Sequence, residues 1–237
     1  MTDIASLMKQ ATTEANSSLP RVDIEFLMSH YLSKPRSWLY AFSDYQLTPE
    51  QGVEFQALIT RRMNGEPVAY ITGRRGFWSF DLQVTPDTLI PRPETELLVE
   101  LAIERIDLNS DTNVLDLGTG TGAIALAIAH ERPKAHVLAV DHSEAALAVA
   151  KSNAAELKIR NIECIQSDWY STIVGQRFDV IVSNPPYIEL NDEHLSQGDL
   201  RYEPSSALVS GADGLDAIRI IIAGAKNHLN PNAWLMI

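Results

Sequence analysis

Residues 182–190, VSNPPYIEL, place an amide, two prolines and a tyrosine directly after an apolar stretch that is typical of a strand. Prolines fix φ and remove backbone donors, so Pro185 and Pro186 end the strand and stiffen the residues that follow. One interpretation is a rigid loop that carries Tyr187 on its surface. The other is that a stiff strand end aims the Asn184 side chain and a few carbonyl groups at a ligand.

The second interpretation has a definite chemistry. An amide or aryl amine nitrogen is a poor nucleophile, because its lone pair is delocalised into the neighbouring carbonyl group or ring. If the Asn184 side-chain oxygen and the Pro185 carbonyl oxygen each accept one N–H, they fix the nitrogen and turn its lone pair toward an electrophile. Tyr187 offers a ring on which a planar substrate group can stack. A site of this kind can hold and orient a planar nitrogen.

A second candidate site is the glycine-rich segment 114–128, VLDLGTGTGAIALAI, between an expected strand and an expected helix. Glycines allow a ligand to approach the backbone closely, and the helix that follows offers free N–H groups. The G-x-G-x-G spacing differs from the G-x-G-x-x-G of dinucleotide-binding loops. Asp116, just before the first glycine, would repel a pyrophosphate. A dehydrogenase is therefore disfavoured, and the ligand-binding candidates are Gly118, Thr119, Gly120, Thr121 and Gly122.

Two further strands of the expected sheet also end in aspartate. Asp141 ends HVLAVD, where its carboxylate can accept hydrogen bonds from both hydroxyls of a ribose. Asp168 follows IECIQS, where it can accept from an adenine amino group beside the ring of Trp169. Each aspartate alone could be a simple cap. Three strand ends in register with a glycine loop instead favour a nucleoside-binding edge.

Composition and charge disfavour several classes of protein. The net charge of −12 disfavours an extended nucleic-acid interface, which needs clustered Lys and Arg. No apolar run approaches the roughly 18 residues that span a bilayer, and no secretion signal is evident. We expect a cytoplasmic protein, and we interpret the single Cys164 as a buried, reduced thiol without a catalytic role.

The pattern of elements predicts a small helical domain over residues 1–67, a connecting β-hairpin over 68–91 with its turn at Gly-Arg-Arg-Gly, and an α/β domain over 92–237. A capping box at Thr48, Pro49 and Gln51 should begin one of the N-terminal helices. In the third segment, apolar strands alternate with helices, which predicts a doubly wound parallel sheet with helices on both faces.

The glycine loop, Asp141 and the strand-end aspartates resemble the S-adenosylmethionine-dependent methyltransferases with a Rossmann-like fold. The resemblance covers residues 90–237. It implies S-adenosylmethionine as the cofactor, S-adenosylhomocysteine as the product and no metal. On this resemblance the loop 118–122 lies along the methionine and ribose, Asp141 holds the ribose, and Asp168 with Trp169 contacts the adenine. Asn184 then lies beside the reactive methyl group.

The motif NPPY resembles the signature of methyltransferases that act on adenine, guanine or a glutamine side chain. Together with LIPRPETE at 89–96 and the helical N-terminal segment, it resembles the release factor glutamine methyltransferase family over essentially the whole chain. The resemblance implies methylation of the glutamine in the Gly-Gly-Gln motif of class I peptide chain release factors. The N-terminal helices would then bind the factor, and Asn184, Pro185, Pro186 and Tyr187 would contact the glutamine.

Other residues of the family pattern have two interpretations. Four of them should lie near the methionine end of the cofactor: Arg92, Pro93, Thr95 and Glu96. For Arg92 and Glu96, a salt bridge at the helix start is an equally good interpretation. The long loop 188–215 is of a length that is commonly functional, and we expect Glu203 and Pro204 to help to close the site.

Two alternative functions remain. A nucleic-acid N-methyltransferase would need a basic channel leading to Tyr187. A module that binds the cofactor without catalysis would need a degraded Asn184 or glycine loop, and both are intact. Methyltransferases of this class have further strands after AWLMI, so we expect a fragment of a longer protein, and we expect it to be a monomer.

Overall fold

The structure is a computed structural model that describes residues 2–14 and 19–237, and the chain divides into two compact units at Gly73 and Arg74. Each unit has its own apolar core. No helix of the described residues is long and apolar enough to cross a membrane.

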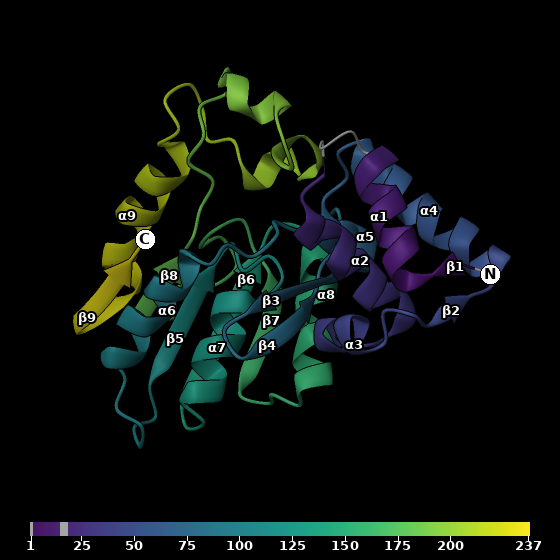
Figure 1. The fold of residues 1–237 in the computed structure, drawn as a ribbon. Helices are drawn as coiled ribbons and strands as arrows, with labels where there is room; N and C mark the ends of the chain where they lie inside the picture. Colours follow the sequence, from purple (N-terminus) through teal and green to yellow (C-terminus); the bar gives the residue numbers. More distant parts are fainter. Residues whose placement is uncertain (1, 15–18) are drawn as a thin grey trace. The chain divides into compact units, whose positions relative to one another are not determined.

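The N-terminal unit is a bundle of helices with a minimal two-stranded sheet (Figure 1). Its helices are α1 (Ile4–Glu14), α2 (Arg21–Leu32), α3 (Arg36–Ala41), α4 (Pro49–Met63) and α5 (Val68–Thr72), and β1 (Thr2–Asp3) pairs antiparallel with β2 (Gln46–Leu47). The predicted capping box is confirmed: the Gln51 N–H donates to Thr48 Oγ1 at 3.2 Å, and the Thr48 N–H donates to Gln51 Oε1 at 2.9 Å.

The predicted hairpin is present, but its predicted turn is wrong. The strands are β3 (Arg74–Phe77) and β4 (Phe80–Gln83), so the turn lies at Trp78 and Ser79. Residues 68–72 form helix α5, and Gly73 closes that helix at φ 69°, a left-handed conformation that glycine adopts without steric cost. The Gly-Arg-Arg-Gly segment therefore ends a helix and begins a strand.

The C-terminal unit contains the predicted parallel sheet. Its strand order is β7 (Ile162–Gln166), β6 (His136–Asp141), β5 (Asn113–Leu117), β8 (Phe178–Ser183) and β9 (Leu229–Met236). All four pairings are parallel. The chain winds outward from β5 through β6 to β7 and then restarts on the other side of β5 with β8. Open sheets of this kind bind ligands beyond the carboxyl ends of the strands, where the winding reverses.

Alternate side chains of the strands pack on opposite faces of the sheet. Val114 and Val137 join the core under α6 (Thr95–Glu104), α7 (Ala123–Glu131) and α8 (Glu144–Leu157). Leu115 and Leu138 join the other core, which is covered by α9 (Asp216–His228). The predicted α/β class, with helices on both faces, is confirmed (Figure 1).

The loop from β8 to α9 contains three short 3₁₀ turns, Glu193–Ser196, Leu200–Tyr202 and Ser205–Ala207. Hydrogen bonds anchor it to the strand end, because the Ile188 N–H donates to the Leu208 carbonyl and the Ser210 N–H donates to the Ile188 carbonyl, each at 2.9 Å. Its C-terminal half is thereby held beside the end of β8.

Cys164 differs from its prediction. It lies on the edge strand β7 and is half-buried, where we expected a buried side chain. Burial nevertheless raises the pKa of its thiol, which keeps the thiol protonated and weakly nucleophilic.

Candidate functional site

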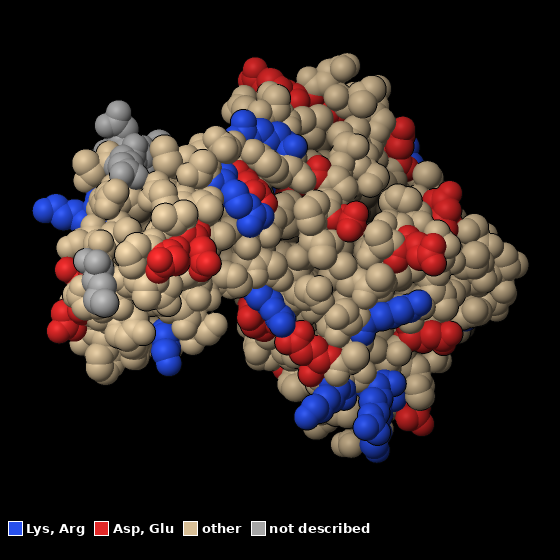
Figure 2. Space-filling view, turned by 90° about the vertical axis from the view of Figure 1, so that its right-hand side faces the viewer, with Lys and Arg blue, Asp and Glu red and all other residues tan. Residues whose placement is uncertain are grey.

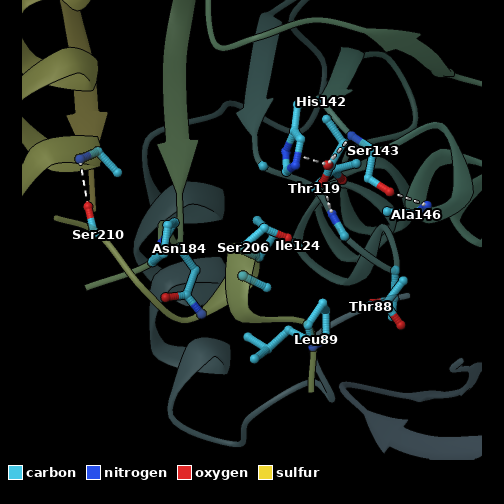
Figure 3. A pocket seen from close by; sticks show the side chains of 18 of the residues that line it. Thr88, Leu89, Thr119, Ile124, His142, Ser143, Ala146, Asn184, Ser206 and Ser210 are labelled. Atoms are coloured by element: carbon cyan, nitrogen blue, oxygen red, sulfur yellow. Dashed lines mark hydrogen bonds and ion pairs between the residues drawn. The ribbon is translucent and has the colours of Figure 1, made fainter. Parts of the chain in front are cut away.

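A cavity of about 470 Å³ lies at the carboxyl edge of the sheet (Figure 3). Its wall includes residues that follow β5, β6, β7 and β8, together with residues from 87–95 and from the loop that leads to α9. The structure thus brings together segments that are far apart in the sequence. Nine of the predicted site residues line the cavity: Gly118, Thr119, Gly120, Thr121, Asp141, Asp168, Trp169, Asn184 and Pro186.

The glycine loop wraps over the end of β6. The N–H groups of Gly118 and Thr119 both donate to the Val140 carbonyl at 2.9 Å, and the Gly120 N–H donates to Asp141 Oδ2 at 2.9 Å. Gly118 and Gly120 have φ of 72° and 55°, so a side chain at either position would be strained. At Gly118 and Gly120 the loop therefore presents bare backbone to the cavity.

Gly122, which the sequence predicts as a cofactor-binding residue, does not line the cavity. It is the first residue before α7, at φ 82°, and a Cβ there would lie 3.1 Å from Leu126 Cδ1 and 3.2 Å from Ala150 Cβ. The third glycine of the motif thus allows α7 and α8 to pack closely.

Asp116 is fully buried beneath this loop and does not line the cavity. Its Oδ2 accepts a hydrogen bond of 2.6 Å from the Thr119 hydroxyl. Burial raises the pKa of the Asp116 carboxyl to about 7, although the hydrogen bond from Thr119 lowers it. Through Thr119, the carboxyl anchors the loop from below.

Asp141 presents a carboxylate to the cavity with capacity to accept further hydrogen bonds. Its Oδ1 accepts from the Ser143 N–H at 2.9 Å, and Oδ2 accepts from Gly120, so each oxygen retains a lone pair. His142 Nδ1 lies 3.4 Å from Oδ1 (Figure 3). Two preoriented carboxylate oxygens can accept from two adjacent hydroxyl groups of a ribose.

Asp168 and Trp169 line the neighbouring part of the wall. Trp169 has φ 49°, and its carbonyl accepts a hydrogen bond of 2.8 Å from Ser167 Oγ, which supports this left-handed turn. A Cβ on Gly118 would lie 3.8 Å from Trp169 Cζ3, so the indole stands beside the glycine loop. The exposed Asp168 carboxylate next to an aromatic ring suits a heteroaromatic base.

Asn184 lies on the wall formed by the end of β8 (Figure 3). Its Nδ2 donates a hydrogen bond of 3.1 Å to Thr95 Oγ1, and no described residue donates to its Oδ1. Just before it, the buried Ser183 hydroxyl donates to the Leu117 carbonyl at 2.7 Å, which fixes the end of β8 against β5. The side-chain oxygen of Asn184 is therefore an available acceptor on a fixed support.

The other three residues of the NPPY motif differ in burial and in whether they line the cavity. Pro185 is buried and does not line the cavity, whereas Pro186 does. Tyr187 is 63% exposed, also outside the cavity lining. The Tyr187 carbonyl lies where a Cβ on Gly214 would collide with it, so the loop backbone packs closely behind the tyrosine.

Sequence comparison identifies the family. Residues 6–73 match the PrmC N-terminal domain model, and residues 94–199 match the methyltransferase small domain model. A release factor glutamine methyltransferase of Xylella fastidiosa (strain 9a5c) is 53% identical over 95% of this chain and 82% of its own length. One of Escherichia coli (strain K12) is 48% identical over 97% of this chain and 83% of its own length. This chain belongs to the release factor glutamine methyltransferase family.

The structural comparison agrees at the level of the fold. A SAM-dependent methyltransferase from Agrobacterium tumefaciens aligns with a TM-score of 0.50 and 20% identity, covering 69% of this chain and 51% of that one. The sheet described above is thus the methyltransferase fold, as membership of the glutamine methyltransferase family requires.

Some residues of the family segment RPETE line the cavity, and others hold neighbouring elements in place. Arg92 and Thr95 line the cavity, while Pro93 and Glu96 do not. Glu96 Oε1 instead accepts from the Trp78 N–H at 2.8 Å and so holds the hairpin turn. Arg92 forms an ion pair with the buried Glu203, which belongs to the loop 188–215 and not to the start of α6.

Glu203 connects two walls of the cavity. Its side chain is fully buried, and besides Arg92 it accepts a hydrogen bond of 3.0 Å from the Ile90 N–H. The neighbouring Pro204 lines the cavity, as do Ser206 and Ser210. The loop of residues 188–215 is therefore attached to the segment that precedes α6.

Some site residues could not be recognised from the sequence. Thr88, Ser206 and Ser210 line the cavity but belong to no motif with a chemical role, and Leu89 and Ile124 line it as apolar residues of segments 89–96 and 114–128 (Figure 3). Asn153, in the middle of α8, is buried and donates to the carbonyl groups of Gln83 at 3.0 Å and Thr121 at 2.9 Å. An isolated asparagine within a helix gives no sign of this link between the hairpin and the glycine loop.

Proposed function

We propose that this chain transfers a methyl group from S-adenosylmethionine to the side-chain nitrogen of a glutamine in the Gly-Gly-Gln motif of class I peptide chain release factors. The relatives' names support the substrate. The observation that carries the proposal is the Asn184 amide on the cavity wall, with its nitrogen bonded to Thr95 and its oxygen available.

The described residues fit the cofactor. Asp141 has two accepting oxygens for ribose hydroxyls, and Trp169 with Asp168 suits an adenine. The glycine loop lets a ligand lie against the backbone at Gly118 and Gly120. S-adenosylmethionine, when bound, supplies a sulfonium methyl group that is an electrophile.

Asn184 acts on the glutamine nitrogen in this proposal. Its Oδ1 accepts one N–H of the substrate amide. We expect the backbone carbonyl oxygen of Pro185, whose ring is buried outside the cavity lining, to accept the other. With the methyl donor bound, these two acceptors would turn the nitrogen lone pair toward the transferable methyl group, and the methylated nitrogen would release a proton to solvent. Orientation of a weak nucleophile is the main contribution, so no strong base is needed.

Tyr187 and the N-terminal unit are proposed to bind the release factor. The exposed ring of Tyr187 can stack on the planar amide. In the N-terminal unit, Phe26, Tyr40 and Phe42 are 47%, 56% and 49% exposed, which is typical of a protein-binding surface. We further expect a cytoplasmic monomer.

A nucleic-acid substrate is less well supported. The net charge is −12, and the face shown in Figure 2 carries Lys and Arg interspersed with Asp and Glu. Nucleic-acid binding of useful strength depends on clustered cations.

The test is transfer of a labelled methyl group to a purified release factor, beside its Gly-Gly-Ala variant and a structured RNA. Label should enter only the glutamine-containing factor. Label in the RNA alone would reject the proposed substrate and leave the cofactor site standing.

The role of Asn184 is tested with Asn184→Ala, which should bind S-adenosylhomocysteine normally while kcat falls by about 100-fold or more, because the nucleophile loses its orientation. An unchanged kcat would contradict the mechanism.

A further inference from the structure

The Asn184 side chain makes one hydrogen bond with the described residues, and that bond reaches a different element. Thr95, which accepts it at 3.1 Å, is the first residue of α6, 89 positions earlier in the chain. The Thr95 N–H donates to the Arg92 carbonyl at 3.0 Å, so the backbone at Thr95 is held independently of Asn184.

The reaction needs one particular end of this amide to face the substrate. Rotation about the last side-chain bond of asparagine has a broad, roughly two-fold profile, so packing alone holds the amide plane weakly. If the NH₂ group faced the substrate, two donors would meet and the glutamine nitrogen would not be held. The inner NH₂ group therefore needs an acceptor, and the Thr95 hydroxyl is the one present.

We propose that Thr95 is a positioning residue for methyl transfer, which holds the Asn184 amide so that Oδ1 faces the substrate nitrogen. This inference rests on the proposed function. Thr95 acts through Asn184, so its loss lowers the rate of the chemical step and leaves cofactor affinity unchanged.

The experiment compares Thr95→Val, which removes the hydroxyl and keeps the shape, with Thr95→Ser, which restores a hydroxyl. Thr112→Val is the matched control. Thr112 directly precedes β5, at the end of the strand away from the cavity, and its hydroxyl contacts Ser110 Oγ at 2.6 Å. Variants of the whole 237-residue chain are assayed for kcat and KM with the release factor, and for S-adenosylhomocysteine affinity by calorimetry.

For Thr95→Val we expect kcat to fall by about 10- to 100-fold, as for other small misplacements of a catalytic group, with the dissociation constant of S-adenosylhomocysteine unchanged. Thr95→Ser and Thr112→Val should keep kcat close to that of the unchanged chain. If Thr95→Val does not fold, Thr95→Ala removes the same hydroxyl and carries the same expectation.

Combining Thr95→Val with Asn184→Ala gives the decisive comparison. If Thr95 acts only through Asn184, the double variant is no slower than Asn184→Ala alone. A normal kcat in Thr95→Val beside a low kcat in Asn184→Ala overturns this inference and leaves the proposed function intact. A normal kcat in Asn184→Ala rejects the mechanism itself, and additive losses show that Thr95 acts by another route.

Discussion

Burial raises the pKa of the Asp116 carboxyl, and the stability of the fold therefore depends on pH. Its pKa is raised to about 7 in the fold, whereas in the unfolded chain it titrates near its ordinary value of 3.8. Between these pH values the folded state holds a proton that the unfolded state has lost. The contribution of Asp116 to stability therefore falls as pH rises through this range, and the full penalty is present above pH about 7.

We predict that Asp116→Asn removes this dependence, because the amide does not ionise and its oxygen can still accept from Thr119. The melting temperature of the variant, relative to the unchanged chain, should increase from pH about 5 to pH about 8 and then level off, in line with a raised acid pKa. Thermal unfolding across this range measures the difference. Parallel curves for the two proteins would show that the Asp116 carboxyl does not hold its proton in the folded state across this pH range.

At the residue scale, the sequence predicted those site residues that terminate a strand. Asp141 and Asn184 line the cavity because parallel strands end at one edge, and that edge follows from the alternation of elements. Thr95 and Glu203 were expected near the site, but their partners could not be predicted. The contacts of Asn184 with Thr95 and of Ile90 with Glu203 join residues 89 and 113 positions apart.

At the scale of elements, Glu203 attaches the loop of residues 188–215 to the segment before α6. We predict that Glu203→Ala leaves the Arg92 guanidinium and the Ile90 N–H without their partner and lowers the free energy of unfolding by about 3 kcal/mol. Cofactor affinity should fall as well, because both attached segments line the cavity. Urea denaturation and calorimetry measure the two effects.

Glu193→Ala is the control, since Glu193 is an exposed residue of the same loop and its loss should change stability by less than about 0.5 kcal/mol. Equal stability of the two variants would mean that the buried pair does not hold the loop.

Two helical glycines should respond oppositely to the same substitution. Gly52 in α4 has open space where a Cβ would lie, whereas a Cβ on Gly224 in α9 would overlap the ring of Tyr170. We predict that Gly52→Ala raises the free energy of unfolding by about 0.5–1 kcal/mol through helix propensity. Gly224→Ala should lower it by about 1–3 kcal/mol through overpacking. Changes of the same sign in denaturant unfolding would contradict this packing of α9.

The hairpin shows why turns are harder to predict than strands. Gly73 and Gly76 flank two arginines, which is a plausible turn by composition, yet the chain turns at Trp78 with φ 56°. That conformation is unusual for tryptophan and is supported from outside the hairpin. Glu96 accepts from the Trp78 N–H, and Glu131 Oε1 accepts from Nε1 at 2.8 Å. Local propensity contains no information about these two glutamates.

At the scale of the molecule, the cavity belongs entirely to the unit that begins at Arg74. We predict that residues 74–237 expressed alone bind S-adenosylhomocysteine with an affinity close to that of the full chain, while methylation of a release factor falls sharply. Calorimetry and the transfer assay separate the two properties, and circular dichroism verifies folding. A folded fragment that does not bind the cofactor would show that the N-terminal unit contributes to the cavity.

The order of the strands has a further consequence, for the path of folding. Strand β5 finds β6 nearby in the chain, but its other neighbour is β8, with Val114 paired to Val180. Because non-local pairing is slow, β5 must keep an apolar edge open until β8 has docked. Asn184 and Ser210, which complete the cavity, come after β8 in the sequence. We therefore expect a ligand to bind only after β8 has docked, and so to slow unfolding rather than accelerate folding.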